Sequence, residues 1–337
     1  MNMRFIINRL IYTIFMFIFV ITLNFFLFRL MPGDPLTIVS KEIASSPEGR
    51  ATMEKMYGLD KPMIEQYFDY IKSMITFDFG TSFNYKQPVT EILFSKIKNS
   101  LILGFASVPI GIVIGLLGGI VAAARRGKRT DMVITTTSMI IYAIPTFWLA
   151  MIFLMVFGVK LGWVPINGMA TPGVDFVNNI AYLKDLFYHL AIPVLSYSLA
   201  IFGSYLLIMR GSMVDVFTED YVLTARAKGL TEKQVIRRHV VPNAMLPVST
   251  MIISSLALIF TGAFSIEVLF SWPGMGRLMI ESVSRRDYPV MQASNYLIAV
   301  AVILANFIMD ILYSYIDPRV RVESYGNDRQ FKKVKRS

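Results

Sequence analysis

The sequence NSLILGFASVPIGIVIGLLGGIVAAA, residues 99–124, predicts the fold class most directly. It contains no Asp, Glu, Lys or Arg. A helix needs about 20 apolar residues to cross the hydrocarbon core of a bilayer, because lipid offers no hydrogen-bond partner to a bare backbone N–H or C=O group. The stretch therefore predicts a helix that crosses a membrane.

Five further runs lack these charged residues and are long enough to span: 10–28, 132–159, 186–209, 240–266 and 288–309. None shows the alternation of a strand. Hydrophobic residues make up 55% of the 337 residues and charged residues 17%, whereas soluble domains are typically about 45–50% apolar and about 25% charged. The composition argues against a soluble enzyme and predicts an all-α polytopic membrane protein with six transmembrane helices.

The charges between the runs predict the orientation. With the N-terminus inside, the inner segments hold 19 Lys and Arg against 8 Asp and Glu: 1–9, 125–131, 210–239 and 317–337. The outer segments hold 13 of each kind: 31–98, 160–185 and 271–287. Because cytoplasmic loops carry the excess of Lys and Arg, we expect both termini in the cytoplasm.

The runs divide the chain into four parts. Residues 1–30 hold the N-terminus and the first span, which we interpret as a retained anchor because Arg29-Leu30-Met31-Pro32 is no small-residue cleavage site. Residues 31–98 form a small external subdomain. Residues 99–316 form a five-helix core with a cytoplasmic loop at 210–243, and residues 317–337 form a basic cytoplasmic tail.

The external subdomain contains a predicted amphipathic helix that opens at Pro62. Its apolar residues recur at helical spacing and should share one face: Ile64, Tyr67, Phe68, Ile71 and Ile75. Two interpretations stay open, a lid over the outer helix ends and a docking surface for an external partner. The loop of 68 residues between the first two spans is far longer than a helix connection needs.

Two of the spans carry residues that shape helices. Gly111, Gly115 and Gly119 recur at intervals of four, which puts small residues on one face of the second span. Such a stripe lets a neighbouring backbone approach closely and predicts helix packing there. Pro145 lies within the third span and predicts a bend.

The cytoplasmic loop 210–243 is too charged to enter the membrane and indicates two short helices, 219–228 and 231–239. Gly229 fits the position after the first helix, where a positive φ costs glycine little. Thr231 and Gln234 form the pattern of a capping box at the start of the second. A rigid helix–turn–helix of this kind is suited to passing force between a membrane bundle and a soluble partner.

Chemistry-bearing motifs are missing from the sequence. There is no Cys, and His189 and His239 are the only histidines, which excludes a disulfide framework, a thiolate metal site and a His-rich metal site. The one Gly-Lys pair is followed by Arg129, where a nucleotide-binding loop needs Ser or Thr. We expect no catalytic residue, no metal site and no cofactor bound by this chain.

Within the loop, YVLTARAKGL at residues 221–230, followed by Pro242, resembles the EAA loop of ABC-importer permeases. Gly229 stands at the glycine of that pattern, while Leu223 replaces its Glu and His239 its Ile. Three further stretches are similar to the dipeptide, oligopeptide and nickel permease family: RLMPGDP at 29–35, FSWPGMG at 270–276 and DPRVR at 317–321. The long external loop is similar to that of the B-type member.

This resemblance implies one transmembrane subunit of a larger ATP-driven importer, with the fold of an ABC type I importer. The chain would form half of the translocation path, beside a second homologous permease, in the cell membrane. Two cytoplasmic ATPase subunits would use ATP and Mg, and an extracellular or periplasmic solute-binding protein would deliver the solute. No nucleic acid is implied.

The resemblance also implies functional residues. The loop that couples to the ATPase would comprise Asp220, Tyr221, Thr224, Ala225, Arg226, Ala227, Lys228, Gly229 and Pro242. Ala225 would face the groove of the ATPase, while Arg226 and Lys228 would pair with its acidic groups. A possible external gate or docking site would comprise Glu267, Trp272, Pro273 and Gly274.

Peptides are the expected cargo, and nickel chelates or oligosaccharides are the alternatives within the same machinery. A secondary carrier would place acidic residues near mid-membrane, and few ionisable residues lie within the spans. A membrane scaffold without transport activity also stays open on the sequence alone.

Overall fold

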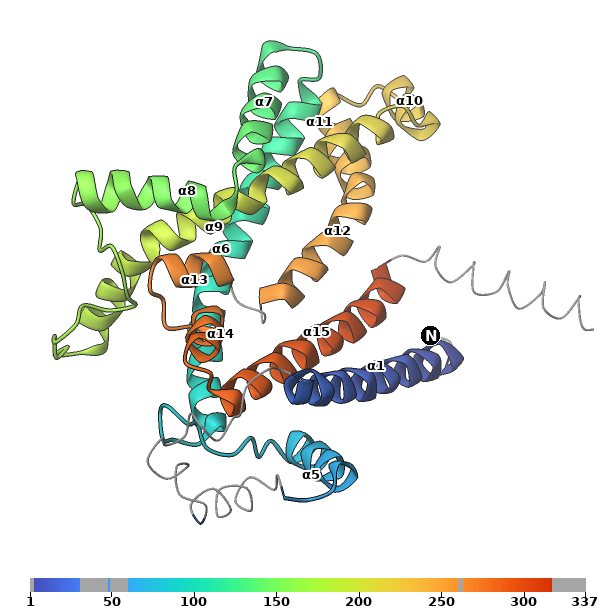
Figure 1. Cartoon of the computed structure of the whole chain (residues 1–337). Coiled ribbons are helices and arrows are strands. Elements are labelled where there is room, and N and C mark those ends of the chain that lie inside the picture. The colour runs from blue at the N-terminus through green and yellow to red at the C-terminus, as the bar shows by residue number, and fades with distance from the viewer. Residues whose placement is uncertain (1–2, 31–47, 49–59, 260–262, 317–337) are drawn as a thin grey trace, which may run out of the picture.

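The computed structural model describes residues 3–30, 48, 60–259 and 263–316. Its helices follow one another along the chain as shown in Figure 1: α1 (Met3–Leu30), α5 (Met63–Thr76), α6 (Val89–Ala124), α7 (Arg129–Ala143), α8 (Thr146–Phe153), the π-helix η1 (Leu154–Lys160), α9 (Asn179–Val216), α10 (Asp220–Ala227), α11 (Glu232–Val235), the π-helix η2 (Ile236–Val240), α12 (Val241–Leu258), α13 (Phe264–Leu269), α14 (Met275–Ser284) and α15 (Tyr288–Ile316). The motifs at 31–35 and 317–321, much of the external subdomain and the basic tail lie outside the described residues.

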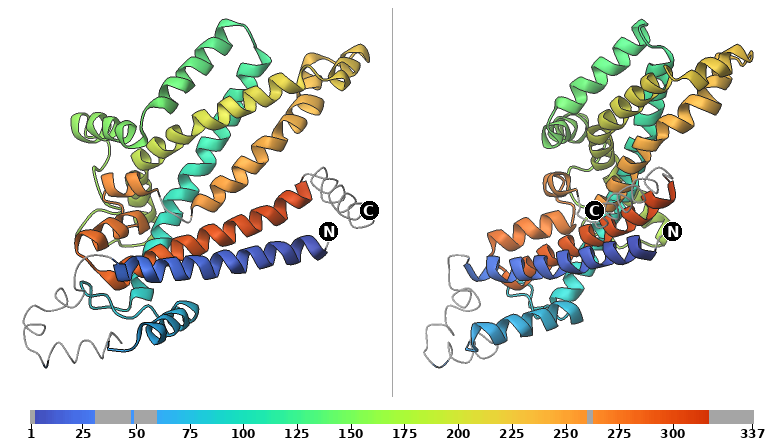
Figure 2. Two further views of the ribbon diagram at one scale, coloured as in Figure 1. Left: turned by 45° about the vertical axis from the view of Figure 1, so that its right-hand side comes forward. Right: turned by 90° about the vertical axis from the view of Figure 1, so that its right-hand side faces the viewer.

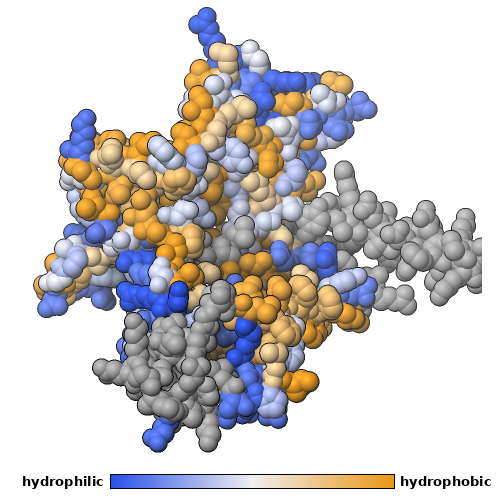
Figure 3. Space-filling model, viewed as in Figure 1, coloured by the Kyte–Doolittle hydropathy of each residue, from blue (hydrophilic) through white to orange (hydrophobic). Residues whose placement is uncertain are grey.

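Five segments of the described chain are long and apolar enough to cross a membrane, or six if α7 and the α8–η1 arm together make one span. The five are α1, α6, α9, the α11–α12 segment and α15. Figure 3 shows hydrophobic side chains gathered over α8 and over the α1–α15 pair, where a soluble protein would be polar. The prediction of an all-α polytopic membrane protein is confirmed.

The third predicted span is not one continuous helix. α7 and the arm formed by α8 and η1 are bent by 98° relative to each other (Figure 1). Pro145 has no N–H to donate, and it restricts Ile144 to extended backbone, with φ −76° and ψ 126°. The sequence predicted a bend at Pro145, and the structure makes it a complete break.

α6 and α9 form the centre of the bundle, and they cross closely in both views of Figure 2. A Cβ added at Gly115 would lie 2.5 Å from the carbonyl oxygen of Phe202, and one at Gly119 would lie 2.7 Å from that of Leu206. A Cβ added at Gly111 would lie 2.7 Å from the carbonyl oxygen of Ser198. The small-residue stripe therefore lies against the α9 backbone.

α1 lies along α15 and beside the external helix α5 (Figure 2). Asn24 joins the three elements and is 2% exposed. Its Nδ2 donates to the hydroxyl of Tyr70 at 2.7 Å and to the carbonyl of Gln292 at 3.1 Å, and its Oδ1 accepts from Asn295 at 2.8 Å. A buried amide with all these partners fixes the place of α5 on the bundle.

The apolar face of α5 differs from the predicted one. Tyr67 and Ile71 turn toward α1, whereas Ile64, Phe68 and Ile75 are exposed. The predicted face is therefore split, because the contact with α1 uses the Tyr67, Tyr70, Ile71 and Met74 side of the helix. A single stripe at helical spacing cannot say which half of it meets the neighbouring helix.

Candidate functional site

The cytoplasmic hairpin, named for the side of the membrane on which the sequence predicts it, comprises residues 217–240. These residues lie between α9 and α12 and hold α10, α11 and η2. Gly229 has φ +80°, so the predicted positive φ is confirmed. The capping box is confirmed as well, since the Thr231 hydroxyl accepts from the Gln234 N–H and the Gln234 side chain accepts from the Thr231 N–H. The second predicted helix, 231–239, is not a separate helix, because α11, η2 and α12 follow one another without a break.

Pro242 lies in the first turn of α12, directly after η2. A proline cannot donate the usual helical hydrogen bond, and its ring clashes with the carbonyl four residues earlier. The π-helix η2, in which the regular i→i−4 hydrogen bonds are replaced, lies directly before this position. Pro242 thus lies at the junction between the cytoplasmic hairpin and the α12 helix.

The hairpin attaches to the bundle through apolar side chains. Val222, Ala225 and Val235 are buried in one core with Tyr205 and Met213 of α9. Ala225 is only 4% exposed within this single chain. The expectation that it faces an ATPase groove is therefore wrong, because the helical period places it on the inner side with Val222.

The polar side chains of the hairpin divide into two groups. Arg226 is engaged within the chain, since its Nε lies 2.7 Å from Oε1 of Glu232 and its guanidinium lies over the ring of Phe217. This ion pair lies at the surface, so the expectation that Arg226 pairs with an ATPase stays a prediction. The remaining predicted residues on α10 and its end are exposed: Asp220, Tyr221, Thr224, Ala227 and Lys228.

The second half of the hairpin is basic. Lys233, Gln234, Arg237 and Arg238 line a cavity of about 370 Å³. The sequence analysis named only Gln234 of these four, for the capping box, and did not predict a basic cluster. The three basic side chains give this end of the molecule a cationic surface.

The external latch comprises two buried carboxylates, Glu267 and Asp287, and the groups that they bind. Glu267 is 0% exposed. Its Oε1 accepts from the Ser100 hydroxyl at 2.6 Å and its Oε2 accepts from the Gly276 N–H at 2.6 Å. Glu267 therefore holds the start of α14 against α6.

The residues around Glu267 are packed just as closely. A Cβ at Gly274 would lie 2.5 Å from the Glu267 carboxyl, so only glycine fits there. Trp272 is 0% exposed, and its Nε1 donates to the Asn99 carbonyl at 2.9 Å. The Asn99 side chain in turn donates to the carbonyl of Pro273 at 2.9 Å.

This burial corrects the expected docking role. Glu267, Trp272 and Gly274 lie inside the chain and cannot touch an external partner directly. What they can do is set the position of α14, because Glu267 accepts from the Gly276 N–H in its first turn. A gating role for these residues remains a prediction.

Asp287 was missed by the sequence reasoning. It is 1% exposed, and it accepts from the Ser82 hydroxyl at 2.5 Å and from the backbone N–H groups of Phe83 and Asn84 at 3.2 and 3.0 Å. It therefore ties the external segment before α6 to the start of α15. An Asp two residues before a proline at the head of a span was the only available signal.

A third external carboxylate lies nearer to solvent. Burial raises the pKa of Glu281, but hydrogen bonds from Arg277 and Tyr85 outweigh it and hold the pKa below its ordinary value. Burial, together with the hydrogen bond to Glu281, raises the pKa of Tyr85. Among the described residues, no group of three His, Cys, Asp or Glu side chains could hold a metal ion.

Comparison with known proteins settles the family. Residues 115–322 match the model of the binding-protein-dependent transport system inner membrane component, and residues 2–104 match the N-terminal membrane component of such systems. The chain belongs to this family of transport permeases. It is therefore a multi-pass inner-membrane permease of an ABC transporter, whose other parts are a solute-binding protein and ATPase partners.

Several curated permeases are similar over almost their whole length. The oligopeptide transport system permease protein AppB of Bacillus subtilis is 36% identical, over 94% of this chain and 98% of that one. The dipeptide transport system permease protein DppB of Escherichia coli K12 is 34% identical, over 95% and 99%. The oligopeptide transport system permease protein OppB of Haemophilus influenzae is 34% identical, over 95% and 99%.

A solved structure shares the fold of this permease. The inward-facing MetNI methionine ABC transporter matches with a TM-score of 0.52 at 17% identity, covering 67% of this chain and 96% of that one. At this identity the match concerns the fold alone. It agrees with the prediction of an ABC importer-like bundle.

Proposed function

We propose that this permease imports dipeptides or oligopeptides, driven by ATP hydrolysis in its partner subunits. The observation that carries the proposal is the set of full-length relatives, which are named as peptide permeases. The solute would be delivered by a solute-binding protein on the outer side. ATP and Mg would be bound by the ATPases and not by this chain.

The assembly contains a second, homologous permease, and the two together enclose the path. Both termini and the cytoplasmic hairpin face the cytoplasm. The excess of Lys and Arg in these segments supports the orientation, and the hairpin lies at the same end of the molecule as the α6–α7 turn (Figure 1).

The cytoplasmic hairpin is the coupling element. Its exposed side, with Thr224 and Lys228, meets an ATPase subunit, while Val222 and Ala225 carry the motion into α9 and α12. On the outer side, the exposed surface of α5 and α14 meets the binding protein. The external latch holds α14 on α6, and Asn24 holds α5 on the bundle.

Transport tests the cargo. The chain is reconstituted in proteoliposomes with its second permease, ATPases and binding protein, and ATP-dependent uptake is measured for a labelled dipeptide, a labelled tetrapeptide, a nickel–histidine chelate and an oligosaccharide. We expect saturable uptake of the peptides. Uptake of the chelate or the oligosaccharide without uptake of either peptide would overturn the peptide proposal.

Co-purification tests the coupling element. Lys228→Glu reverses an exposed charge on the hairpin and should lower ATPase retention by roughly fivefold, the size of one exposed ion pair lost and turned repulsive. Lys160→Glu makes the same charge change at the end of η1 and should leave retention unchanged. Wild-type retention in Lys228→Glu would place the coupling surface elsewhere.

A further inference from the structure

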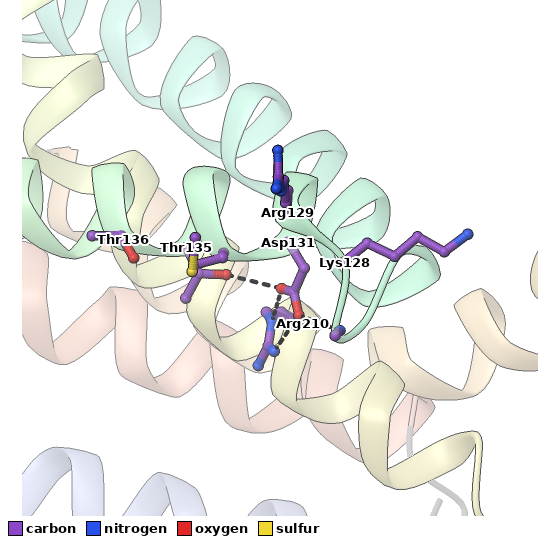
Figure 4. Close-up of a pocket in the computed structure, with 8 residues that line it drawn as sticks. Lys128, Arg129, Asp131, Thr135, Thr136 and Arg210 are labelled. Carbon is purple, nitrogen blue, oxygen red and sulfur yellow. Dashed lines mark hydrogen bonds and ion pairs between the residues drawn. The ribbon is translucent and has the colours of Figure 1, made fainter.

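A cavity of about 460 Å³ opens between the cytoplasmic ends of α7 and α9 (Figure 4). Its lining includes Lys128, Arg129, Asp131, Thr135, Thr136 and Arg210. The proposed coupling of this permease uses none of these residues. Three cations and one carboxylate leave the lining with two positive charges in excess.

The carboxylate in the cavity is fully occupied. Arg210 reaches from α9 and pairs with both oxygens of Asp131, at 2.6 Å from Nε and 2.8 Å from Nη2. The Thr135 hydroxyl and the Gly127 N–H also donate to Asp131, at 3.1 and 3.0 Å. Asp131 is 5% exposed and has no capacity left to neutralise a further cation.

The two remaining cations lie at the rim of the cavity. Figure 4 shows Lys128 and Arg129 extending away from the Asp131–Arg210 pair. Both are exposed, and neither side chain has an ion-pair partner within the described part of the chain. They are open to an anion that comes from outside the protein.

The rim of the cavity is also apolar on one side. Met132, which lines the cavity, and its neighbour Val133 lie near the start of α7 and are 64% and 58% exposed. Both side chains belong to α7, a helix of 15 residues that would form one span together with the α8–η1 arm. Cations beside an apolar helix surface at the membrane boundary match the two parts of an anionic lipid, its phosphate and its acyl chains. A free phosphate ion would use the cations and leave the apolar surface without a role.

We propose that this cavity binds the phosphodiester headgroup of an anionic phospholipid from the cytoplasmic leaflet. Lys128 and Arg129 contact the phosphate, and Met132 and Val133 contact the acyl chains. The proposal goes beyond the transport function and rests on the proposed orientation of the chain, not on its cargo. The bound lipid would brace α7, which is cut off from the α8 arm at Pro145, against α9.

Native mass spectrometry of the full-length chain in detergent tests the site. The probes are a phosphatidylglycerol and a phosphatidylcholine with the same acyl chains, each titrated with and without inorganic phosphate. We expect a phosphatidylglycerol adduct that survives equimolar inorganic phosphate and a much weaker phosphatidylcholine adduct. Displacement by inorganic phosphate would make this a free-anion site, and equal binding of both lipids would make it unspecific; either result overturns the proposal.

Matched variants locate the binding. Lys128→Gln with Arg129→Gln should weaken phosphatidylglycerol binding about 25-fold, at roughly fivefold per basic side chain. Lys128→Arg with Arg129→Lys keeps the charge and should keep the affinity. Arg125→Gln with Arg126→Gln removes the same charge from residues just outside the lining. This variant should retain most of the affinity for phosphatidylglycerol.

Two results of these variants would count against the cavity. Equal losses in the 125/126 and 128/129 pairs would indicate a diffuse basic patch, and an unchanged affinity in the 128/129 pair would remove the site altogether. Thermal melting of each variant serves as the folding control. The exposed rim side chains should not affect it, because the Asp131–Arg210 pair stays intact.

Discussion

The external latch and the cytoplasmic hairpin are held by opposite kinds of interaction. In the external latch, Glu267 and Asp287 are 0% and 1% exposed, and both bind hydroxyl and backbone N–H groups from other segments. In the cytoplasmic hairpin the buried side chains are apolar, such as Val222 and Val235. Its ion pair, between Arg226 and Glu232, lies at the surface.

The contacts at one end of the chain are therefore directional, and those at the other end are not. A hydrogen bond to a buried carboxylate is directional and costly to break, so it specifies a single arrangement. Apolar contacts have no preferred direction, and they keep most of their free energy when two surfaces slide by a small distance. The latch therefore fixes α14 on α6 and the segment before α6 on the start of α15, whereas the hairpin meets α9 through buried apolar side chains.

Removal of the latch carboxylate should have the largest effect. Glu267→Ala would leave the Ser100 hydroxyl and the Gly276 N–H buried without a partner, at about 1–3 kcal/mol each. We expect the unfolding free energy in detergent, measured by steric trapping, to fall by roughly 2–5 kcal/mol. Glu281→Ala removes a more exposed carboxylate of the same external surface and should cost less than 1 kcal/mol, about the value of an exposed ion pair. Equal losses of unfolding free energy in the two variants would show that burial does not distinguish the two carboxylates.

A charge placed inside the hairpin should have the next largest effect. Ala225→Glu puts a carboxylate among Val222, Val235 and Met213, with a desolvation cost of several kcal/mol. We expect faster protease cleavage within residues 217–240, while the spans remain protected. Ala227→Glu, on the exposed side of the same helix, should cleave at the wild-type rate. Equal cleavage of the two variants would mean that the hairpin does not pack on the bundle through Ala225.

Backbone strain at the hairpin turn should have a smaller effect. Gly229 has φ +80° and open space around it, so Gly229→Val adds strain without a clash, about 1–2 kcal/mol. Gly229→Asn should cost less, because asparagine tolerates this region better. Hydrogen exchange of the α10 amides measures the local opening. Equal exchange in the valine and asparagine variants would indicate that the turn relaxes to negative φ.

The pH dependence of the exposed external pair should be the smallest effect. The pKa of Glu281 is depressed below its ordinary value of 4.5, so its ion pair with Arg277 stabilises the fold above about pH 4.5. That contribution is lost as the pH falls through the depressed pKa. The melting temperature of wild type should exceed that of Glu281→Gln slightly at pH 7, and the gap should close below pH 4.5. A difference in melting temperature that grows in acid would contradict the predicted pH dependence and exclude the Glu281 carboxylate as its cause.

The features that could be predicted from the sequence depend on neighbours along the chain. Five of the six apolar runs correspond to long apolar helices, because satisfaction of the backbone in lipid is a local requirement. The positive φ of Gly229 and the Thr231–Gln234 capping box were also predictable, since each involves residues within a few positions. The orientation of α10 was not, because either side of a short helix could have met α9.

The sequence by itself determined that this protein is a bundle of membrane-crossing helices with a helical turn between the fourth and fifth, since hydrophobicity, glycine and proline act locally. Which residues of these helices contact one another could be seen only in the folded chain. Glu267 and Ser100 are 167 positions apart, and Asp287 and Ser82 are 205 apart, and no local pattern marks which of several acids will be buried. The burial of Ala225 has the same origin, because it depends on which side of α10 meets α9, whereas the break at Pro145 is local and only its angle of 98° came from the folded chain.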